Sequence, residues 1–169
     1  MHKKRILCFD NSGAIGDAML KLPFLSMIRS NYPDADLLWY SPSSSVFAGA
    51  LSSVATSMGI SDIITRPVFN PNVNRASLKD LFSSRFFNNC DALGKDFDIV
   101  FDTQTHVKTT LLLKKIPTKF FISSAANFLF STIKPPRNKR KKHEHLAYRT
   151  LDLAKMVCDI VQGKDRIIF

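Results

Sequence analysis

One carboxylate, Asp17, lies in a glycine-containing segment that directly follows a short apolar run. The run is Ile6–Phe9 and the segment is Ser12–Pro23, with glycine at positions 13 and 16. We expect a strand, a turn and a helix in that order. Ligands of open α/β sheets bind at the carboxyl ends of strands, and glycine lets a partner approach the backbone closely. Asp17 is therefore a candidate functional group, and the alternative is that it only caps the helix.

The glycine spacing of this turn argues against a dinucleotide-binding site. Gly13 and Gly16 do not complete the G-x-G-x-x-G pattern of dinucleotide-binding proteins. A nucleotide-binding domain that uses the Ser12–Asp17 turn is therefore a disfavoured alternative.

A second apolar run delivers polar side chains to its carboxyl end. Asp102, Thr103, Gln104 and His106 follow it, and Lys108 falls in the first turn of the next expected helix. A cation at a helix N-terminus is disfavoured by the helix dipole unless an anionic ligand also binds there. The alternative is that Asp102 caps this helix and Lys108 is only solvated.

Positive charge is concentrated in one segment. The net charge is +10, and Lys134–Lys142 contains six basic residues and no acidic one, so the rest of the chain carries only +4. Such a run is most often a solvated loop, but it also suits an anionic membrane surface. It lacks interleaved aromatic side chains for base stacking, so we expect no nucleic-acid partner. His143 and His145 have a poor spacing for a metal ligand pair on a helix, and we expect no metal.

Apolar periodicity indicates the fold class. Strands alternate with helices, which predicts an α/β fold: a Rossmann-like, mostly parallel sheet with helices on both faces. The last helix is expected to bury the face formed by Leu146, Thr150, Leu153, Val157 and Ile160. Pro23 either bends the first helix or marks its start. The expected strands are 5–9, 37–40, 63–65, 99–101 and 120–122, and the expected helices are 17–31, 44–58, 77–87, 107–115 and 144–161.

Composition fits a single soluble domain. A chain of 169 residues can bury a normal core. Its three cysteines, Cys8, Cys90 and Cys158, have no C-x-x-C spacing and suit free thiols in a reducing cytoplasm. Neither a signal peptide nor a membrane span is expected.

Taken together, these motifs resemble glycosyltransferase family 9, the ADP-heptose:lipopolysaccharide heptosyltransferases. The shared features are the Ile-Gly-Asp turn with its Leu-Pro helix, the Pro-Asp-Ala-Asp approach to the second strand, the Asp-Thr-Gln strand end with Lys108, and the His145…Arg149 helix. The resemblance covers residues 3 to about 161. It implies the N-terminal half of a two-domain GT-B enzyme: 1–162 as the Rossmann-like acceptor-binding domain, 163–169 as the start of an interdomain linker, and the C-terminal donor-binding domain absent.

The resemblance also implies an activity and a set of site residues. The reaction is an inverting transfer of heptose from ADP-heptose to an acidic sugar of the lipopolysaccharide inner core, without a metal or other cofactor. Asp17 would be the general base, since such a displacement needs a carboxylate beside the acceptor hydroxyl. Acceptor-binding residues would be Gly16, Arg66, Lys108, His145 and Arg149. The Lys134–Lys142 loop would face the anionic membrane surface that displays the lipid A-linked acceptor, at the inner face of the inner membrane.

This sequence departs from the family pattern in one motif. Thr105 and His106 follow Gln104 where the family usually has glycine, which affects the loop near Lys108. The competing interpretation is a truncated or split-gene acceptor-binding remnant that has no transferase activity of its own.

Overall fold

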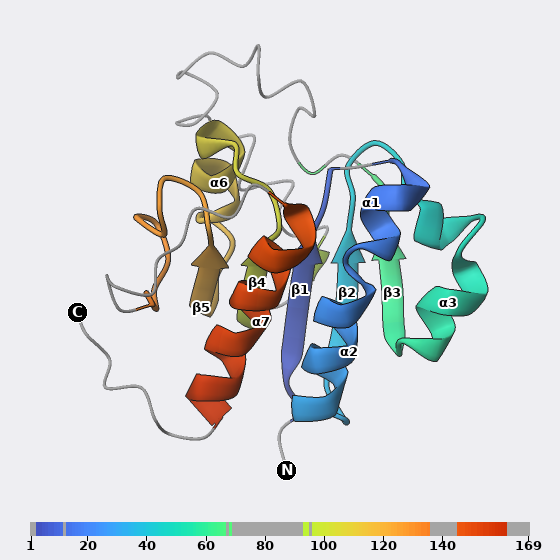
Figure 1. The fold of residues 1–169 in the computed structure, drawn as a ribbon, viewed down its shortest axis with the longest axis horizontal. Helices are drawn as coiled ribbons and strands as arrows, with labels where there is room; N and C mark the ends of the chain where they lie inside the picture. The colour runs from blue at the N-terminus through green and yellow to red at the C-terminus, as the bar shows by residue number, and fades with distance from the viewer. Residues whose placement is uncertain are drawn as a thin grey trace.

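The computed structural model describes residues 3–11, 13–66, 68, 93–94, 96–135 and 145–161. Its centre is a five-stranded parallel sheet in the order β3-β2-β1-β4-β5 (Figure 1). The strands are β1 (Arg5–Phe9), β2 (Asp36–Tyr40), β3 (Ile60–Ile64), β4 (Phe97–Asp102) and β5 (Thr118–Ser123). The predicted α/β class with a parallel sheet is confirmed.

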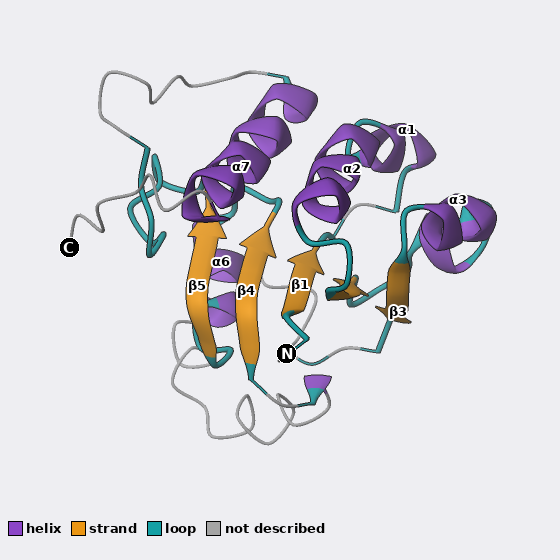
Figure 2. Cartoon of the chain, turned by 90° about the horizontal axis from the view of Figure 1, so that it is seen from below, coloured by secondary structure: helices purple, strands orange, loops and turns teal. Residues whose placement is uncertain are grey.

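Side chains of β1 alternate between two hydrophobic clusters, one on each face of the sheet. Ile6 and Cys8 belong to the first cluster, and Leu7 and Phe9 belong to the second. This alternation follows from the two-residue period of a strand, and burial on both faces explains why the run is continuously apolar. In Figure 2, the helices α2 (Leu22–Asn31) and α7 (Leu146–Val161) lie together on one side of the sheet, whereas α6 (Val107–Leu113) lies behind β4 and β5.

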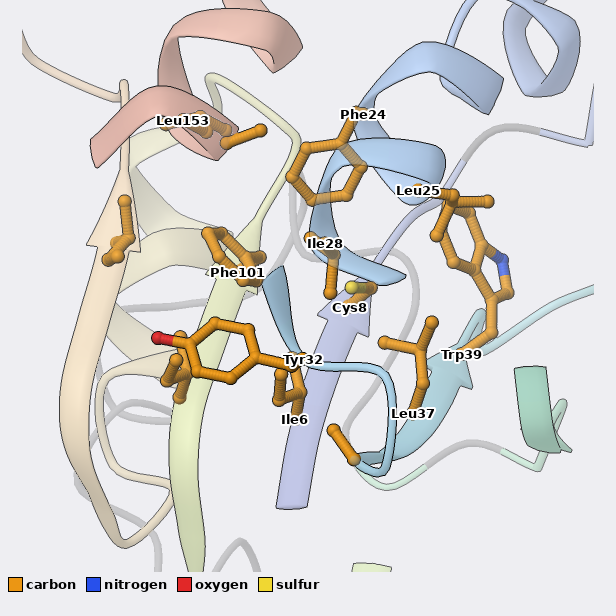
Figure 3. Close-up of a cluster of buried hydrophobic side chains, with 14 of the residues drawn as sticks. Ile6, Cys8, Phe24, Leu25, Ile28, Tyr32, Leu37, Trp39, Phe101 and Leu153 are labelled. Carbon is orange, nitrogen blue, oxygen red and sulfur yellow. The ribbon is translucent and has the colours of Figure 1, made fainter. Parts of the chain in front are cut away.

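The first cluster is built mainly from aromatic and branched side chains of the sheet, α2 and α7 (Figure 3). Phe24 of α2 meets Phe101 of β4 edge to face, with their ring centroids 5.1 Å apart. Leu153 of α7 is fully buried in the same cluster. The second cluster brings Leu112 and Leu113 of α6 against the opposite face of the sheet. Both faces are thus covered, as predicted.

Two of the expected helices are each divided into two shorter elements. The single helix expected over 17–31 is two helices, α1 (Ile15–Met19) and α2 (Leu22–Asn31), and Pro23 lies at the start of α2. Proline is tolerated in a first turn, where its missing N–H costs no hydrogen bond, so it marks a start here. The helix expected over 44–58 is a 3-10 turn, η1 (Val46–Ala48), followed by α3 (Ser52–Ser57). The helix expected over 77–87 lies outside the described residues.

Strand β3 begins three residues earlier than expected. Ser61 and Asp62 are exposed, because β3 is an edge strand of the sheet. Polar residues are common at such an edge, and they interrupt the apolar pattern that the prediction used. Strands β4 and β5 also extend beyond their apolar centres.

The last helix, α7 (Leu146–Val161), confirms the predicted amphipathic face as far as its side chains are described. Thr150 and Leu153 are fully buried, and Leu146 is half-buried. On the other side of the sheet, α6 (Val107–Leu113) begins where it was expected. None of the helices in the described ranges is long and apolar enough to cross a membrane.

Candidate active site at the carboxyl edge of the sheet

Three helices begin at the edge of the sheet toward which all strands point (Figure 1). Helix α1 follows β1, α6 follows β4, and the first turn of α7 reaches the same edge. Parallel strands deliver every following segment to one edge, so residues far apart in sequence meet there. The predicted site residues therefore lie at the same end of the fold.

Asp17 lies in the first turn of α1 and is half-buried. The N-cap of α1 is Ala14, so the interpretation of Asp17 as the capping residue is wrong. A carboxylate in the first turn is still stabilised by the helix dipole. Asp17 is thus a partly accessible carboxylate at the ligand-binding edge of an α/β sheet.

Gly16 also lies in α1, and no atom comes within 4 Å of the position that a Cβ would take. Its backbone is not left-handed, so the described fold does not require glycine there. At Gly13, by contrast, a Cβ would lie 3.0 Å from Ser44 Oγ. Gly13 is therefore the more closely packed of the two glycines.

A buried ion pair closes the segment that carries Asp17. Lys21 Nζ donates to Asp10 Oδ1 at 2.7 Å, and the two side chains are 0% and 2% exposed. Sequence reasoning missed this pair. A signal was present, because Lys21 shares a helical face with Phe24, Leu25 and Ile28, all of which are buried. A lysine on such a face needs a buried partner.

Gln104 connects this ion pair to β4. Its side-chain Nε2 donates to Asp10 Oδ1 at 2.7 Å, and its backbone N–H donates to Asp102 Oδ1 at 2.9 Å. The Asp-Thr-Gln motif thus joins two buried carboxylates. Thr103 completes the junction, since its hydroxyl donates to the Phe9 carbonyl oxygen at 2.9 Å.

Asp102 does not cap α6, contrary to one of the two expectations for it. The N-cap of α6 is His106, whereas Asp102 is fully buried and accepts from Thr110 Oγ1 at 2.6 Å and from Ser123 Oγ at 2.8 Å. Burial raises the pKa of Asp102 to about 6, against the lowering effect of these hydrogen bonds. Asp102 thus ties β4 to α6 and β5, and it is enclosed too fully to meet a ligand.

The cationic candidates lie on three separate segments. Lys108 is exposed in the first turn of α6, and Arg66 is exposed just after β3. His145 is exposed directly before α7, where its Nδ1 accepts from the Ala147 N–H at 3.4 Å. Arg149 follows one turn later and is half-buried, with its Nε enclosed and without a hydrogen-bond partner. The convergence of these side chains with Asp17 on one cleft stays a prediction.

Most of the basic segment lies outside the described residues. Of Lys134–Lys142, only Lys134 and Pro135 are described, and Lys134 is exposed. Within the described ranges, no three His, Cys, Asp or Glu side chains are grouped so that they could hold a metal ion.

An open hollow of about 960 Å³ lies at the other edge of the sheet, beside the amino ends of the strands. Arg29 lines it, but its guanidinium donates to backbone carbonyl oxygens, including those of Pro33 at 2.6 Å and Ala35 at 3.0 Å. A third acceptor is the carbonyl oxygen of Gly59. These bonds tie the end of α2 to the starts of β2 and β3, so Arg29 has a structural role there.

The fold is similar to that of a solved glycosyl transferase of family 9 from Veillonella parvula DSM 2008. The TM-score is 0.58 and the sequence identity is 23%. The match covers 91% of this chain and 41% of that protein, so the chain spans less than half of its length. No protein-family model and no curated protein matches the chain. The likeness establishes that the chain shares a Rossmann-like α/β fold with part of that protein.

Proposed function

We propose that this chain is the acceptor-binding half of a heptosyltransferase-like glycosyltransferase. The observation that carries the proposal is the similarity to the family 9 structure over 91% of the chain. It is supported by the position of Asp17, which lies half-buried at the carboxyl edge of a parallel sheet, where ligands of such sheets bind.

In this proposal, Asp17 accepts the proton of the acceptor hydroxyl while that oxygen forms a bond to the anomeric carbon of the donor sugar. A carboxylate in this role typically contributes a factor of about 10²–10⁴ to the rate. Asp17 lies in the first turn of α1, where its carboxylate is only partly buried.

The acceptor is proposed to be an acidic sugar of the lipopolysaccharide inner core. Lys108 lies in the first turn of α6, His145 and Arg149 lie at the start of α7, and Arg66 follows β3 at the same edge. Charge-assisted hydrogen bonds from such groups suit carboxylates and phosphates. Gly16 offers an open position beside Asp17 where a sugar can approach the backbone.

The donor is proposed to be ADP-heptose, held by a second domain. The transfer gains much of its rate from holding both reactants in register, which is worth about 7–11 kcal/mol when they are well oriented. In this proposal the chain supplies the acceptor side alone, so we expect it to bind acceptor without transferring heptose by itself. The Lys134–Lys142 segment is proposed to lie toward the anionic membrane surface.

Binding measurements on residues 1–169 test this proposal. A deacylated inner-core oligosaccharide and ADP-heptose are each titrated into the ¹⁵N-labelled protein, at low salt and at physiological salt. We expect the oligosaccharide to shift resonances of α1, α6 and α7, more strongly at low salt because exposed charges are screened. Binding of ADP-heptose alone would favour the nucleotide-binding interpretation, and binding of neither ligand would contradict the proposal.

A further inference from the structure

We propose that Lys21 is a positioning residue that fixes the location of Asp17 by closing the β1–α2 connection onto Asp10. The catalytic part of this statement rests on the function proposed for Asp17. The mechanical part, that one buried ion pair holds α1 in place, rests on contacts within the chain alone.

Helix α1 has little to hold it in place by itself. It comprises five residues, of which Ala18 is the buried one, while Ile15 and Met19 are 48% and 54% exposed. A helix of this length is not stable in isolation, because its nucleation cost is spread over too few hydrogen bonds. Its position therefore depends on the packing of Ala18 and on how its two ends are held.

The ion pair fixes both of those ends to the sheet. Asp10 directly follows β1, and its backbone N–H donates to the Tyr40 carbonyl oxygen at 2.9 Å, which continues the β1–β2 ladder. Lys21, 11 positions later, is the N-cap of α2. The 2.7 Å bond between Lys21 Nζ and Asp10 Oδ1 thus joins the end of β1 to the start of α2.

The burial of this ion pair indicates that it fixes a local geometry rather than adding net stability to the fold. A buried ion pair costs about as much in desolvation as it returns, so it seldom adds net stability over apolar side chains of the same size. What it does supply is a defined geometry, since a charged group with one buried partner has one low-energy position. The group whose position it defines is the turn that carries Asp17.

Gln104 extends the same constraint to β4. It donates to the Asp10 oxygen that also accepts from Lys21, and its backbone is held by Asp102. The α1 turn and the loop leading to Lys108 are therefore both held by hydrogen bonds to one buried oxygen atom, Asp10 Oδ1. We expect this shared contact to keep the positions of Asp17 and Lys108 fixed relative to each other.

The test separates local positioning from global stability. In the double variant Asp10→Asn/Lys21→Met, both charges are removed while the introduced amide oxygen can still accept from Gln104, so no unpaired charge is buried. Hydrogen exchange is followed at three amides of the α1 turn, which donate to carbonyl oxygens within it: those of residues 18, 20 and 21. We expect their exchange to rise about tenfold or more, as the loss of a charge-assisted hydrogen bond allows, with the β1 and β4 amides unchanged.

A matched control replaces a lysine of an exposed ion pair. Lys119 lies 3.5 Å from Asp98 and is 75% exposed, so Lys119→Met should leave exchange in the α1 turn unchanged. A third variant, Gln104→Met, should raise exchange in the α1 turn less than the double variant does. Uniform change across all amides, or no change in the α1 turn, would overturn the positioning role.

The functional part has its own measurement. The carboxyl ¹³C resonance of Asp17 is followed with pH in the wild type and in the double variant, and the affinity for the inner-core oligosaccharide is measured in both. A changed Asp17 titration with weaker binding supports the full inference. Faster exchange in α1 with no oligosaccharide binding even in the wild type would leave the positioning of the turn intact and remove the proposed function.

Discussion

Thr110 and Ser123, which belong to two different elements beside β4, donate to the same carboxylate oxygen, Oδ2 of Asp102. Thr110 lies on α6 and Ser123 ends β5, and the two distances are 2.6 Å and 2.8 Å. Asp102 is fully buried, and its other oxygen accepts from the Gln104 backbone. Three elements are thus joined through one carboxylate, and this makes the junction sensitive to its protonation.

We expect Asp102 to make unfolding free energy depend on pH. Its pKa is raised from 3.8 to about 6 in the fold, mainly by burial. The folded state therefore binds this proton more tightly than the unfolded state. The stabilisation is complete below about pH 4, is lost as the pH rises to about 6, and stays constant above that. The loss amounts to about 3 kcal/mol, since each pKa unit corresponds to about 1.4 kcal/mol.

Urea unfolding of the wild type and of Asp102→Asn, at several pH values from 4 to 7, measures this effect. Other carboxylates contribute equally to both proteins, so the difference between the two curves isolates Asp102. The difference should shrink or reverse as the pH rises. Parallel curves across this range would show that Asp102 titrates normally.

Removing either hydroxyl should raise the pKa of Asp102 further. Both hydrogen bonds favour the ionised carboxylate, so Ser123→Ala and Thr110→Val each remove a lowering influence. The carboxyl ¹³C titration of Asp102 measures the change. Thr109→Val is the matched control, because Thr109 is a buried neighbour on α6, and it should leave the midpoint where it is.

The ion pair between Lys21 and Asp10 predicts that a single substitution destabilises the fold more than the double substitution does. Lys21→Met alone leaves Asp10 charged and buried, which typically costs about 3–5 kcal/mol of unfolding free energy. Adding Asp10→Asn removes the stranded charge and should recover most of that loss. Denaturant midpoints of the two variants and the wild type give the comparison. Equal losses in the single and double variants would mean that the charge on Asp10 is not the cause.

Gly16→Ala distinguishes a folding role from a binding role. A Cβ there meets open space, and alanine is favoured over glycine in a helix by about 1 kcal/mol. We therefore expect unchanged or slightly higher thermal stability, with weaker binding of the inner-core oligosaccharide. Gly59→Ala serves as the contrast and should lower stability, since Gly59 has a φ of +68° and a Cβ there would lie 2.6 Å from Arg29 Nε. Full binding by Gly16→Ala would remove Gly16 from the acceptor site.

The sequence predicted the sheet well because each central strand is buried on both faces. The runs around Ile6–Phe9 and Ile99–Phe101 are continuously apolar, a pattern that requires a covered parallel sheet. The edge strand β3 was placed poorly because Ser61 and Asp62 face solvent. Local patterning carries no information on which polar side chains pair across the fold.

Part of the candidate site could be located from the sequence because apolar strands end in polar residues. Strand ends identified Asp102 and Gln104 as residues of the carboxyl edge, and both lie there. The pairing of Lys21 with Asp10 depends on how the β1–α2 connection folds back, which no spacing rule encodes. Lysine among apolar residues was the available signal, because an isolated buried cation is too costly to leave without a partner.

Asp17→Asn tests the central chemical assignment. Asparagine keeps the size of the side chain and its hydrogen-bonding ability but cannot accept the proton of the acceptor hydroxyl. With a donor-binding domain supplied in trans, heptose transfer from ADP-heptose should fall by about 10²–10⁴-fold, while oligosaccharide affinity changes little. Asp34→Asn, at an exposed position in the turn before β2, is the control and should keep full activity. Transfer by residues 1–169 alone would place a donor site within this domain, and transfer by Asp17→Asn at the wild-type rate would assign the base to another residue.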